Sequence, residues 1–364
     1  MLPEDRLLFT LTGQRFTDVR RARAVSICKD HRIQWDYVYE TAFVHGVAPL
    51  VAHNLLSCLS DGLTLPHEML ARWMMSRQQS MDITKARDEI LSEALAYFDA
   101  RDIGVMLIKG AALDLLVYDE PWYTLSEDID IILNVRKQDL TDTSDQEIVD
   151  LFRPLIEHDY FEHHDLNLNG LLPIDFNQIW DRAQQFAHGD SLVFVPSPED
   201  MLLSVCINSF RKRFFSLKNL CDVTETVTYL NDQDLDYSRI VPLARSCKCE
   251  NIVYTALYVA GKYMDCQIPE SLLSDLRVNS VRSAAIAYLV GRQSFSNLAE
   301  MHSGRRIMGR TTSASALLPG AVYRWDQILQ KMLFIWRSRK LAKAGWYDGI
   351  HNLGTDLGSR RTPT

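Results

Sequence analysis

The stretch from residue 105 to residue 135, VMLIKGAALDLLVYDEPWYTLSEDIDIILNV, decides the fold. It opens with a continuous apolar run over residues 105–108, which is typical of a strand buried on both faces. Lys109-Gly110 ends this run, and residues 111–118 predict a helix. A second strand is predicted over residues 129–135. A strand, a helix and a strand in this order indicate a mixed α/β unit.

Two aspartates, Asp128 and Asp130, stand at the beginning of the second predicted strand. Side chains on a strand alternate between its faces, so both carboxylates point the same way, while Ile129 and Ile131 point into the core. Two adjacent carboxylates repel each other unless a cation lies between them. Because oxygen ligands of this kind suit Mg²⁺ or Mn²⁺, the pair predicts a divalent metal site.

Asp175 is the candidate third acid, in a second apolar stretch over residues 171–176 that also predicts a strand. A neighbouring strand would place it beside the first pair, and three carboxylates can hold two metal ions. The alternative for each acid is structural. Asp128 would then cap backbone groups where its strand begins, and Asp175 would be an exposed acid in a turn.

Lys109 and Gly110 predict a phosphate site between the first strand and its helix. Gly110 permits close approach of the backbone, and the N-terminus of a helix attracts anions. The ammonium of Lys109 adds a charge for the β- and γ-phosphates of a nucleoside triphosphate. The alternative for Lys109 is an ordinary surface charge.

The remaining sequence divides into four predicted regions. Residues 1–100 predict helices, because apolar residues recur at helical spacing there. Residues 101–196 form the α/β core. It includes a helix over 144–158, a hairpin of 161–167 with 171–176 that turns at Asn169-Gly170, and a strand over 191–195. Residues 197–300 predict helices that begin with Ser197 as cap and Pro198 in the first turn, and residues 301–364 predict a linker, a basic helix and a tail.

The composition is that of a globular protein, with 47% hydrophobic and 24% charged residues. No apolar run is as long as a membrane span, and the acidic N-terminus does not resemble a signal peptide. The seven cysteines are scattered, which favours reduced core thiols over a disulfide framework. We therefore expect a cytoplasmic protein with no membrane partner.

The charge is unevenly distributed along the chain. Residues 301–364 hold eleven Lys and Arg against three Asp, a net charge of +8. Since the whole chain carries −8, the first 300 residues carry −16. The basic region predicts either an anionic partner, such as nucleic acid, or a solvated helix face that the acidic body attracts, and the second interpretation is favoured.

Two further clusters carry polar chemistry. His158, His163 and His164 lie among acidic residues, which favours a surface loop, with one histidine facing the cleft as the alternative. Residues 211–215, Arg-Lys-Arg-Phe-Phe, combine bases with aromatic residues. They would bind phosphate or stack on a base, or they would form a helix junction with the aromatic residues in the core. The junction is favoured.

The stretch 105–135 resembles the uncharacterised nucleotidyltransferase family of the DNA polymerase β-like superfamily, and a weaker resemblance covers most of residues 20–230. The resemblance implies an α+β fold, a small mixed sheet flanked by N-terminal and C-terminal helical regions. It implies transfer of a nucleoside monophosphate from an NTP to an acceptor with release of pyrophosphate, using two Mg²⁺ or Mn²⁺ ions. By position, the family's functional residues correspond to Asp128, Asp130 and Asp175 as metal ligands and catalytic acids, and to Lys109, Gly110, Ser126, Lys218 and Asp222 at the nucleotide.

The chain also departs from the family pattern. Thr124 stands where the family often has an arginine, and Asn177-Gln178 stand where a His-Trp pair often follows the third acid. These departures favour an alternative hypothesis. In it, the protein is a catalytically weak, antitoxin-like regulatory module that binds nucleotide or a partner. For the enzyme, the acceptor stays open between an RNA end, a protein or peptide, and a small molecule.

Overall fold

The computed structural model describes residues 1–124, 128–136, 161–168, 170–212, 216–233 and 237–276, together with the single positions 139, 148, 214, 280, 283, 284, 286 and 287. The chain divides into two compact units, Met1–Leu318 and Pro319–Thr364. All described residues belong to the first unit, and only that unit is considered below. The predicted helix over 144–158 lies almost entirely outside the described residues, as does the basic region after residue 300.

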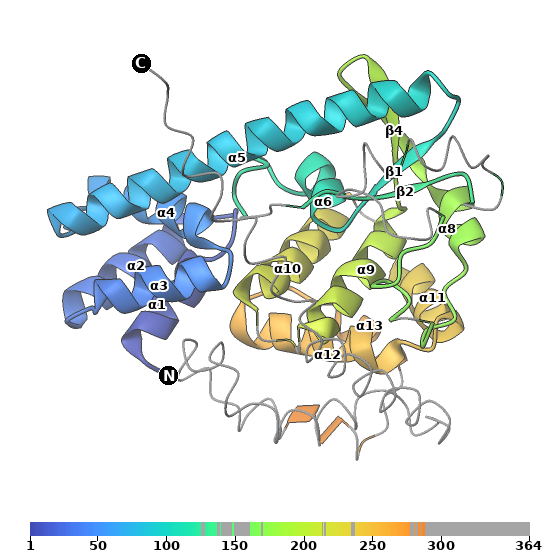
Figure 1. Ribbon diagram of the computed structural model, residues 1–364. Coiled ribbons are helices and arrows are strands. Elements are labelled where there is room, and N and C mark those ends of the chain that lie inside the picture. Colours follow the sequence, from blue (N-terminus) through green and yellow to red (C-terminus); the bar gives the residue numbers. More distant parts are fainter. Residues whose placement is uncertain are drawn as a thin grey trace, which may run out of the picture. The chain divides into compact units, whose positions relative to one another are not determined.

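Helices form the whole N-terminal region, as the sequence predicts. They are α1 (Pro3–Leu11), α2 (Asp18–Asp30), α3 (Trp35–Val44), α4 (Ala48–Ser57), the short 3-10 helix η1 (Cys58–Asp61) and α5 (His67–Asp99). In Figure 1 the long helix α5 runs from the α1–α4 group to the sheet. It begins after Pro66 and ends at Asp99, shortly before β1.

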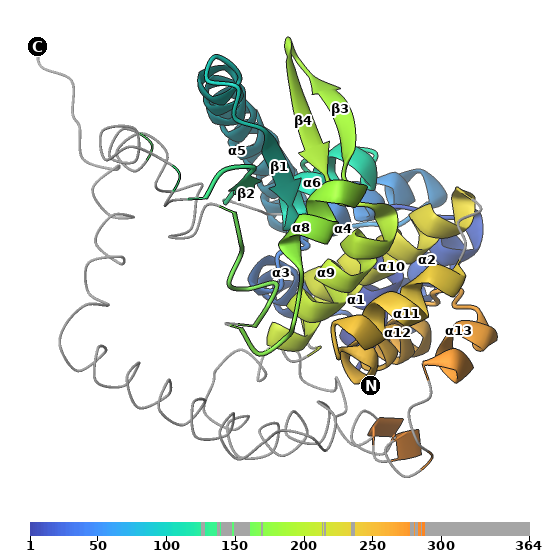
Figure 2. The same ribbon diagram turned by 90° about the vertical axis from the view of Figure 1, so that its right-hand side faces the viewer.

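The sheet has four strands among the described residues, β1 (Val105–Ile108), β2 (Asp130–Leu133), β3 (Gln184–His188) and β4 (Ser191–Val195), in the order β2-β1-β4-β3. β1 pairs antiparallel with β2 and parallel with β4, and β3 forms a hairpin with β4. Figure 2 shows this hairpin beside α5, which β4 contacts. The sheet is therefore small and mixed, as expected.

The two faces of the sheet bury different cores. Leu107, Ile131 and Val193 point into the large core that the surrounding helices share. Met106 and Ile132 point the other way, into a smaller core with residues of the segment 161–179. This alternation follows from the period of two along a strand. It confirms that Ile131 is buried and puts Asp130 on the face of the smaller core.

Helix α6 (Lys109–Leu116) follows β1 directly, and α8 (Phe176–Arg182) packs on the smaller core. The predicted hairpin of 161–167 with 171–176 is wrong. Residues 161–168 and 170–175 form turns and irregular backbone, and Phe176 begins α8. The segment buries Phe161 and Leu166, whose spacing of five matches neither a strand nor a helix face.

The helices after β4 are α9 (Pro198–Arg211), α10 (Leu217–Asp232), η3 (Tyr237–Arg239), α11 (Ile240–Ser246), α12 (Glu250–Tyr263) and α13 (Glu270–Asp275). The start of α9 is as predicted. Pro198 is in its first turn, and the Ser197 hydroxyl accepts the Asp200 backbone N–H at 3.2 Å. All seven cysteines are free, and five of them are buried. No helix in the described part of the chain has both the length and the apolar character needed to cross a membrane.

Candidate active site

Strand pairing brings the basic and acidic residues of the predicted site together. Ile108, the last residue of β1, lies opposite Asp130, the first residue of β2. Lys109 follows Ile108 and begins α6, so its side chain starts next to Asp130 although the two residues are 21 apart in sequence. The prediction that the Lys-Gly pair ends a strand and opens a helix is confirmed.

Lys109 bridges two carboxylates. Its Nζ lies 3.0 Å from Asp130 Oδ1 and 2.8 Å from Asp165 Oδ2. The Lys109 side chain is only 11% exposed, so these are partly buried ion pairs. The backbone of Lys109 has φ = 52°, in the left-handed region that a lysine rarely adopts. Strain of this kind costs of order 1 kcal/mol and is found most often at functional sites.

His163 is the third partner of Asp130. Its ring is 1% exposed, and Nε2 lies 3.1 Å from Asp130 Oδ1. The backbone N–H of Asp165 donates to Nδ1 of the same ring at 3.2 Å. Because Nδ1 accepts, the proton of the neutral ring is on Nε2, and the ring donates it to the carboxylate. His163 is therefore buried against Asp130 and does not lie on the surface, where the favoured prediction for this cluster put it.

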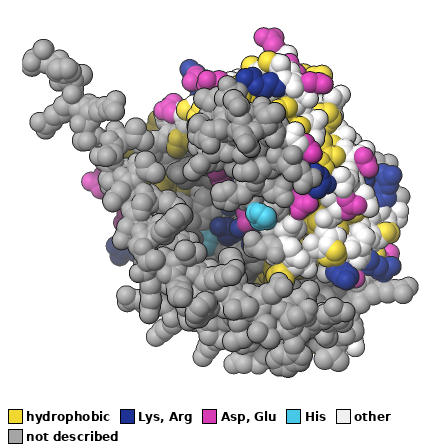
Figure 3. Space-filling model, turned by 45° about the vertical axis from the view of Figure 1, so that its right-hand side comes forward, with side chains coloured by type: hydrophobic (Ala, Val, Ile, Leu, Met, Phe, Trp, Pro, Cys, Tyr) yellow, Lys and Arg dark blue, Asp and Glu magenta, His cyan; other side chains and the backbone are white. Residues whose placement is uncertain are grey.

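Asp165 also pairs with a second basic side chain. Its Oδ1 is paired with Arg211, at the C-terminal end of α9, while its Oδ2 is held by Lys109. Phe214, just beyond Arg211, is buried. The buried Phe214 agrees with the favoured prediction of a helix junction, and Arg211 reaches the acidic cluster, while binding of phosphate or of a base stays a prediction. On the face shown in Figure 3, basic, acidic and histidine side chains lie next to one another.

The surroundings of Asp130 favour its ionised form. Burial raises the pKa of the Asp130 carboxyl, but the hydrogen bond from His163 and the charge of Lys109 outweigh burial, so the pKa is below its ordinary value. Asp130 is thus an anion at neutral pH whose charge is balanced within the cluster.

The other two predicted acids are placed differently. Asp128 is exposed and lies two residues before Asp130, outside β2. Asp175 is also exposed and is the N-cap of α8, where its carboxylate accepts the Asn177 backbone N–H at 3.0 Å and the Gln178 side-chain amide at 3.0 Å. The hydrogen bond from the Asn177 side-chain amide, together with those from the Asn177 backbone and Gln178, lowers the pKa of Asp175, so it too is ionised. The structure shows Asp175 in contact with its own helix and brings Asp165 to Asp130.

The residues expected at the nucleotide are also separated. Gly110 is the second residue of α6, beside Lys109, whereas Ser126 lies outside the described residues. Lys218 and Asp222 pair with each other along α10 at 2.9 Å, and the Tyr118 hydroxyl donates to Asp222 at 2.7 Å. Burial opposes the charge of Lys218, but the carboxylate of Asp222 raises its pKa on balance. This pair joins α10 to the end of α6.

The donor set fits a hard divalent cation in part. Oδ1 of Asp130 and Oδ2 of Asp165 both lie within hydrogen-bonding distance of one ammonium, Lys109 Nζ, which therefore stands in for a cation between two carboxylates. Over the ranges that the structure describes, no three His, Cys, Asp or Glu side chains are gathered closely enough to hold a metal ion. A metal at this place would need Lys109 to withdraw.

The sequence marks the segments of His163 and Arg211 as polar, but it does not predict that they belong to the site. His163 and Asp165 come from irregular backbone, and Arg211 from the end of a helix, so no periodicity indicates where their side chains point. The useful signal is a group of titratable residues between two apolar residues, Phe161 and Leu166, that both reach the core. Such anchors hold the polar residues between them close to the sheet.

Comparison with known proteins places these residues in a family. A family model described as an uncharacterised nucleotidyltransferase matches residues 31–145 and 161–265, which together are more than half of the chain. Every residue of the cluster and each predicted acid lies within the matched ranges. No curated protein matches the chain, and no solved structure does.

Proposed function

The chain belongs to the uncharacterised nucleotidyltransferase family, and from this premise we propose that it transfers a nucleoside monophosphate from an NTP to an acceptor at the site around Lys109 and Asp130. The acceptor oxygen would attack the α-phosphorus, the bond from that phosphorus to the bridging oxygen would break, and pyrophosphate would leave. The observation that supports this place is the cluster in which one lysine joins two carboxylates beside the start of a helix.

The phosphate side of the proposed site is α6. Ile108 occupies the N-cap position and has no polar side chain, so the first N–H groups of the helix lack a side-chain cap. Such a terminus attracts anions, and Lys109 adds a positive charge at the same point. We propose that Lys109 leaves its carboxylate partners to bind the triphosphate, with Gly110 allowing close approach. Lys218, Asp222 and Ser126 stay secondary candidates for the nucleotide.

The acidic side of the proposed site is Asp130 with Asp128, and these two would hold the divalent ion. A bound Mg²⁺ or Mn²⁺ supplies stabilisation of the negative charge that develops on the transferring phosphoryl group. Asp165 is our structure-based candidate for the further acid, and Asp175 stays the candidate that the sequence predicts. Either carboxylate would accept the proton that the acceptor hydroxyl loses. His163 would orient Asp130 through its Nε2 proton.

The test uses each α-labelled NTP with Mg²⁺ or Mn²⁺ and a cell extract, followed by identification of the labelled product. We expect Asp130→Asn and Asp128→Asn to reduce labelling by at least about a hundredfold, because charge stabilisation of this kind is worth several kcal/mol. Asp190→Asn, an exposed acid in the β3–β4 turn, is the matched control and should label normally. Wild-type labelling by the Asp130 variant would contradict the assignment.

One observation supports the alternative hypothesis of a binding module. The charges of Asp130 and Asp165 are already balanced by Lys109 and Arg211, and His163 donates a hydrogen bond to Asp130, a closed arrangement that needs no metal. Thr124, which replaces the family's frequent arginine, is buried and adds no charge. A protein that retains labelled NTP on a filter in the presence of metal and extract, but forms neither labelled product nor pyrophosphate, would support this alternative.

A further inference from the structure

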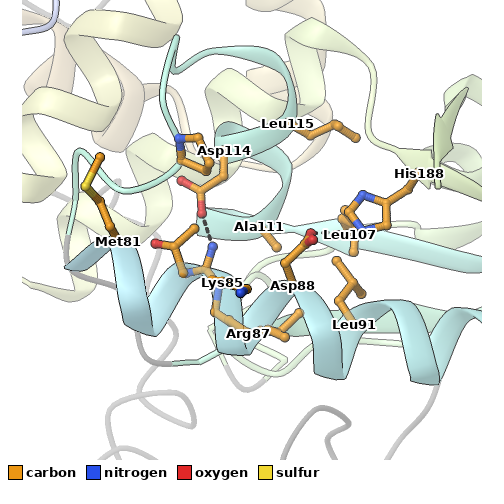
Figure 4. A pocket seen from close by; sticks show the side chains of 13 residues that line it. Met81, Lys85, Arg87, Asp88, Leu91, Leu107, Ala111, Asp114, Leu115 and His188 are labelled. Carbon is orange, nitrogen blue, oxygen red and sulfur yellow. Dashed lines mark hydrogen bonds and ion pairs between the residues drawn. The ribbon is translucent and has the colours of Figure 1, made fainter. Parts of the chain in front are cut away.

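A separate cavity lies on the opposite face of the sheet from the candidate active site. Its volume is about 360 Å³, which is within the range of small-molecule sites. Leu107 and Ile129 contribute to it, whereas their neighbours Ile108 and Asp130 belong to the smaller core and the acidic cluster. Figure 4 shows the cavity between α5 and α6, with β1 behind it and His188 of β3 at one side.

The inner wall of the cavity is apolar. Leu107 and Ala111 are buried and form its floor, and Leu91, Met81 and Leu115 extend this surface from α5 and α6. An apolar body would remove these side chains from water at a gain of about 25 cal/mol per Å² buried. The occupant is therefore expected to carry a hydrocarbon or ring portion.

The charged side chains around the cavity are not all paired. Arg87 is paired with Asp114 deep in the wall, and His188 Nε2 lies 3.2 Å from Asp88 Oδ1 at the other end. Each carboxylate of the lining thus has a basic partner. Lys85, between these two pairs on α5, has no such partner among the described residues. Among the described residues, the lining thus holds one lysine that makes no ion pair, at an exposed position beside an apolar floor.

We propose that this cavity binds a small amphipathic carboxylate, with its apolar body against Leu107 and Ala111 and its acidic group on Lys85. Such an occupant complements both the apolar floor and the unpaired ammonium of Lys85. The site is distinct from the nucleotide site and does not depend on the proposed transfer. It is nevertheless joined to it, because Leu107 and Ala111 flank Lys109 in β1 and α6.

The test measures binding of decanoate to the full-length protein, by displacement of the fluorescent anion 1-anilinonaphthalene-8-sulfonate and by calorimetry. We expect saturable binding of decanoate. Decanol and decylammonium should bind at least about fivefold more weakly, because they lack the ion pair with Lys85. A fivefold change in affinity corresponds to about 1 kcal/mol, which is typical of one exposed ion pair. Equal binding of decanoate and decanol would overturn the charge assignment. Absence of saturable binding would overturn the site.

Variants locate the binding. Lys85→Glu should weaken decanoate at least about fivefold, and Lys85→Arg should retain it, because the arginine keeps the charge. Lys29→Glu, the same charge reversal at an exposed position of α2, is the matched control and should bind as the wild type. Thr84→Trp should fill the cavity and reduce decanoate binding. Unchanged affinity in both Lys85→Glu and Thr84→Trp, with both proteins folded, would place the binding elsewhere and refute the proposal.

Discussion

At the scale of single residues, the site depends on where one lysine places its ammonium. Lys109 adopts φ = 52° and so directs its side chain from the first residue of α6 back toward β2. There it meets Asp130 and Asp165, which would otherwise repel each other. A residue that holds two acids together in a strained conformation is suited to change partners when a stronger anion, such as a triphosphate, arrives.

Two matched substitutions decide which acid completes the site. Asparagine caps a helix as well as aspartate does, so Asp175→Asn keeps α8 intact and removes only the charge. We expect Asp165→Asn to lower nucleotidyl transfer at least about a hundredfold, and Asp175→Asn to lower it less than about tenfold. Labelling rates at saturating Mg²⁺ measure both. The reverse ranking would assign the role to Asp175, as the sequence predicts.

At the scale of elements, the sequence was most informative where structure is regular. The run 105–108 is a strand and residues 129–135 contain β2, because continuous apolar stretches match strands buried on both faces. The run 191–195 is also a strand, although Leu192 is exposed. β3 was missed, since Gln184-Gln185 begins it and most of the strand is polar and exposed, as an edge strand can be. The same holds for the site, where only Lys109 and Asp130, which lie at the ends of predicted strands, could be placed from the sequence.

The segment 161–175 shows why the rest of the site could not be predicted. It looks alternating, but its buried Phe161 and Leu166 are five residues apart, and its hydrogen bonds are those of turns. The positions of His163 and Asp165 depend on how these two anchors pack against Met106 and Ile132. That information is tertiary and has no local period in the sequence.

Helices α5 and α6 are joined by a buried carboxyl that makes stability depend on pH. Burial raises the pKa of Asp114 to about 6, against the lowering effects of Arg87 and Lys218, and Asp222 adds to the rise. The folded state therefore binds more protons than the unfolded state between pH 4 and 6, so stability falls as pH rises through this window and is level above it. The fall is of order 3 kcal/mol.

Urea unfolding between pH 4 and pH 7 measures this contribution. The difference in unfolding free energy between the wild type and Asp114→Asn should decline across the window, while Asp82→Asn, which changes an exposed acid on α5, should keep the wild-type slope. Parallel curves for the wild type and Asp114→Asn would show that Asp114 has an ordinary pKa.

At the scale of the whole first unit, His45 joins the N-terminal helices to α10. Its ring is buried, its Nδ1 accepts the Leu217 backbone N–H at 3.2 Å, and its carbonyl accepts the Lys218 N–H at 3.3 Å. This explains the His-Gly turn between α3 and α4 as a structural link. It also ties the predicted region 1–100 to the helices that follow the sheet, so we expect them to unfold together.

His45→Ala tests this link. The change leaves a buried N–H without its acceptor, so unfolding should be easier by about 2 kcal/mol while remaining a single transition. His31→Ala, an exposed histidine after α2, should unfold like the wild type. Calorimetry checks both the midpoint and the number of transitions. Two resolved transitions in the wild type would contradict a cooperative link between these regions.

The pairing of Ile108 with Asp130 has a consequence for how the chain tolerates rearrangement. The distance between Lys109 and Asp130 is fixed by a ladder of backbone hydrogen bonds, and not by the length of chain that connects them. A circularly permuted protein, opened between β1 and β2 after α6 and rejoined elsewhere, would bring the same two charges together. A one-residue slip within β2 would instead turn Asp130 into the core and Ile131 out of it. A change in the length of the connection would therefore leave the pair in place, whereas an insertion within β2 would separate it.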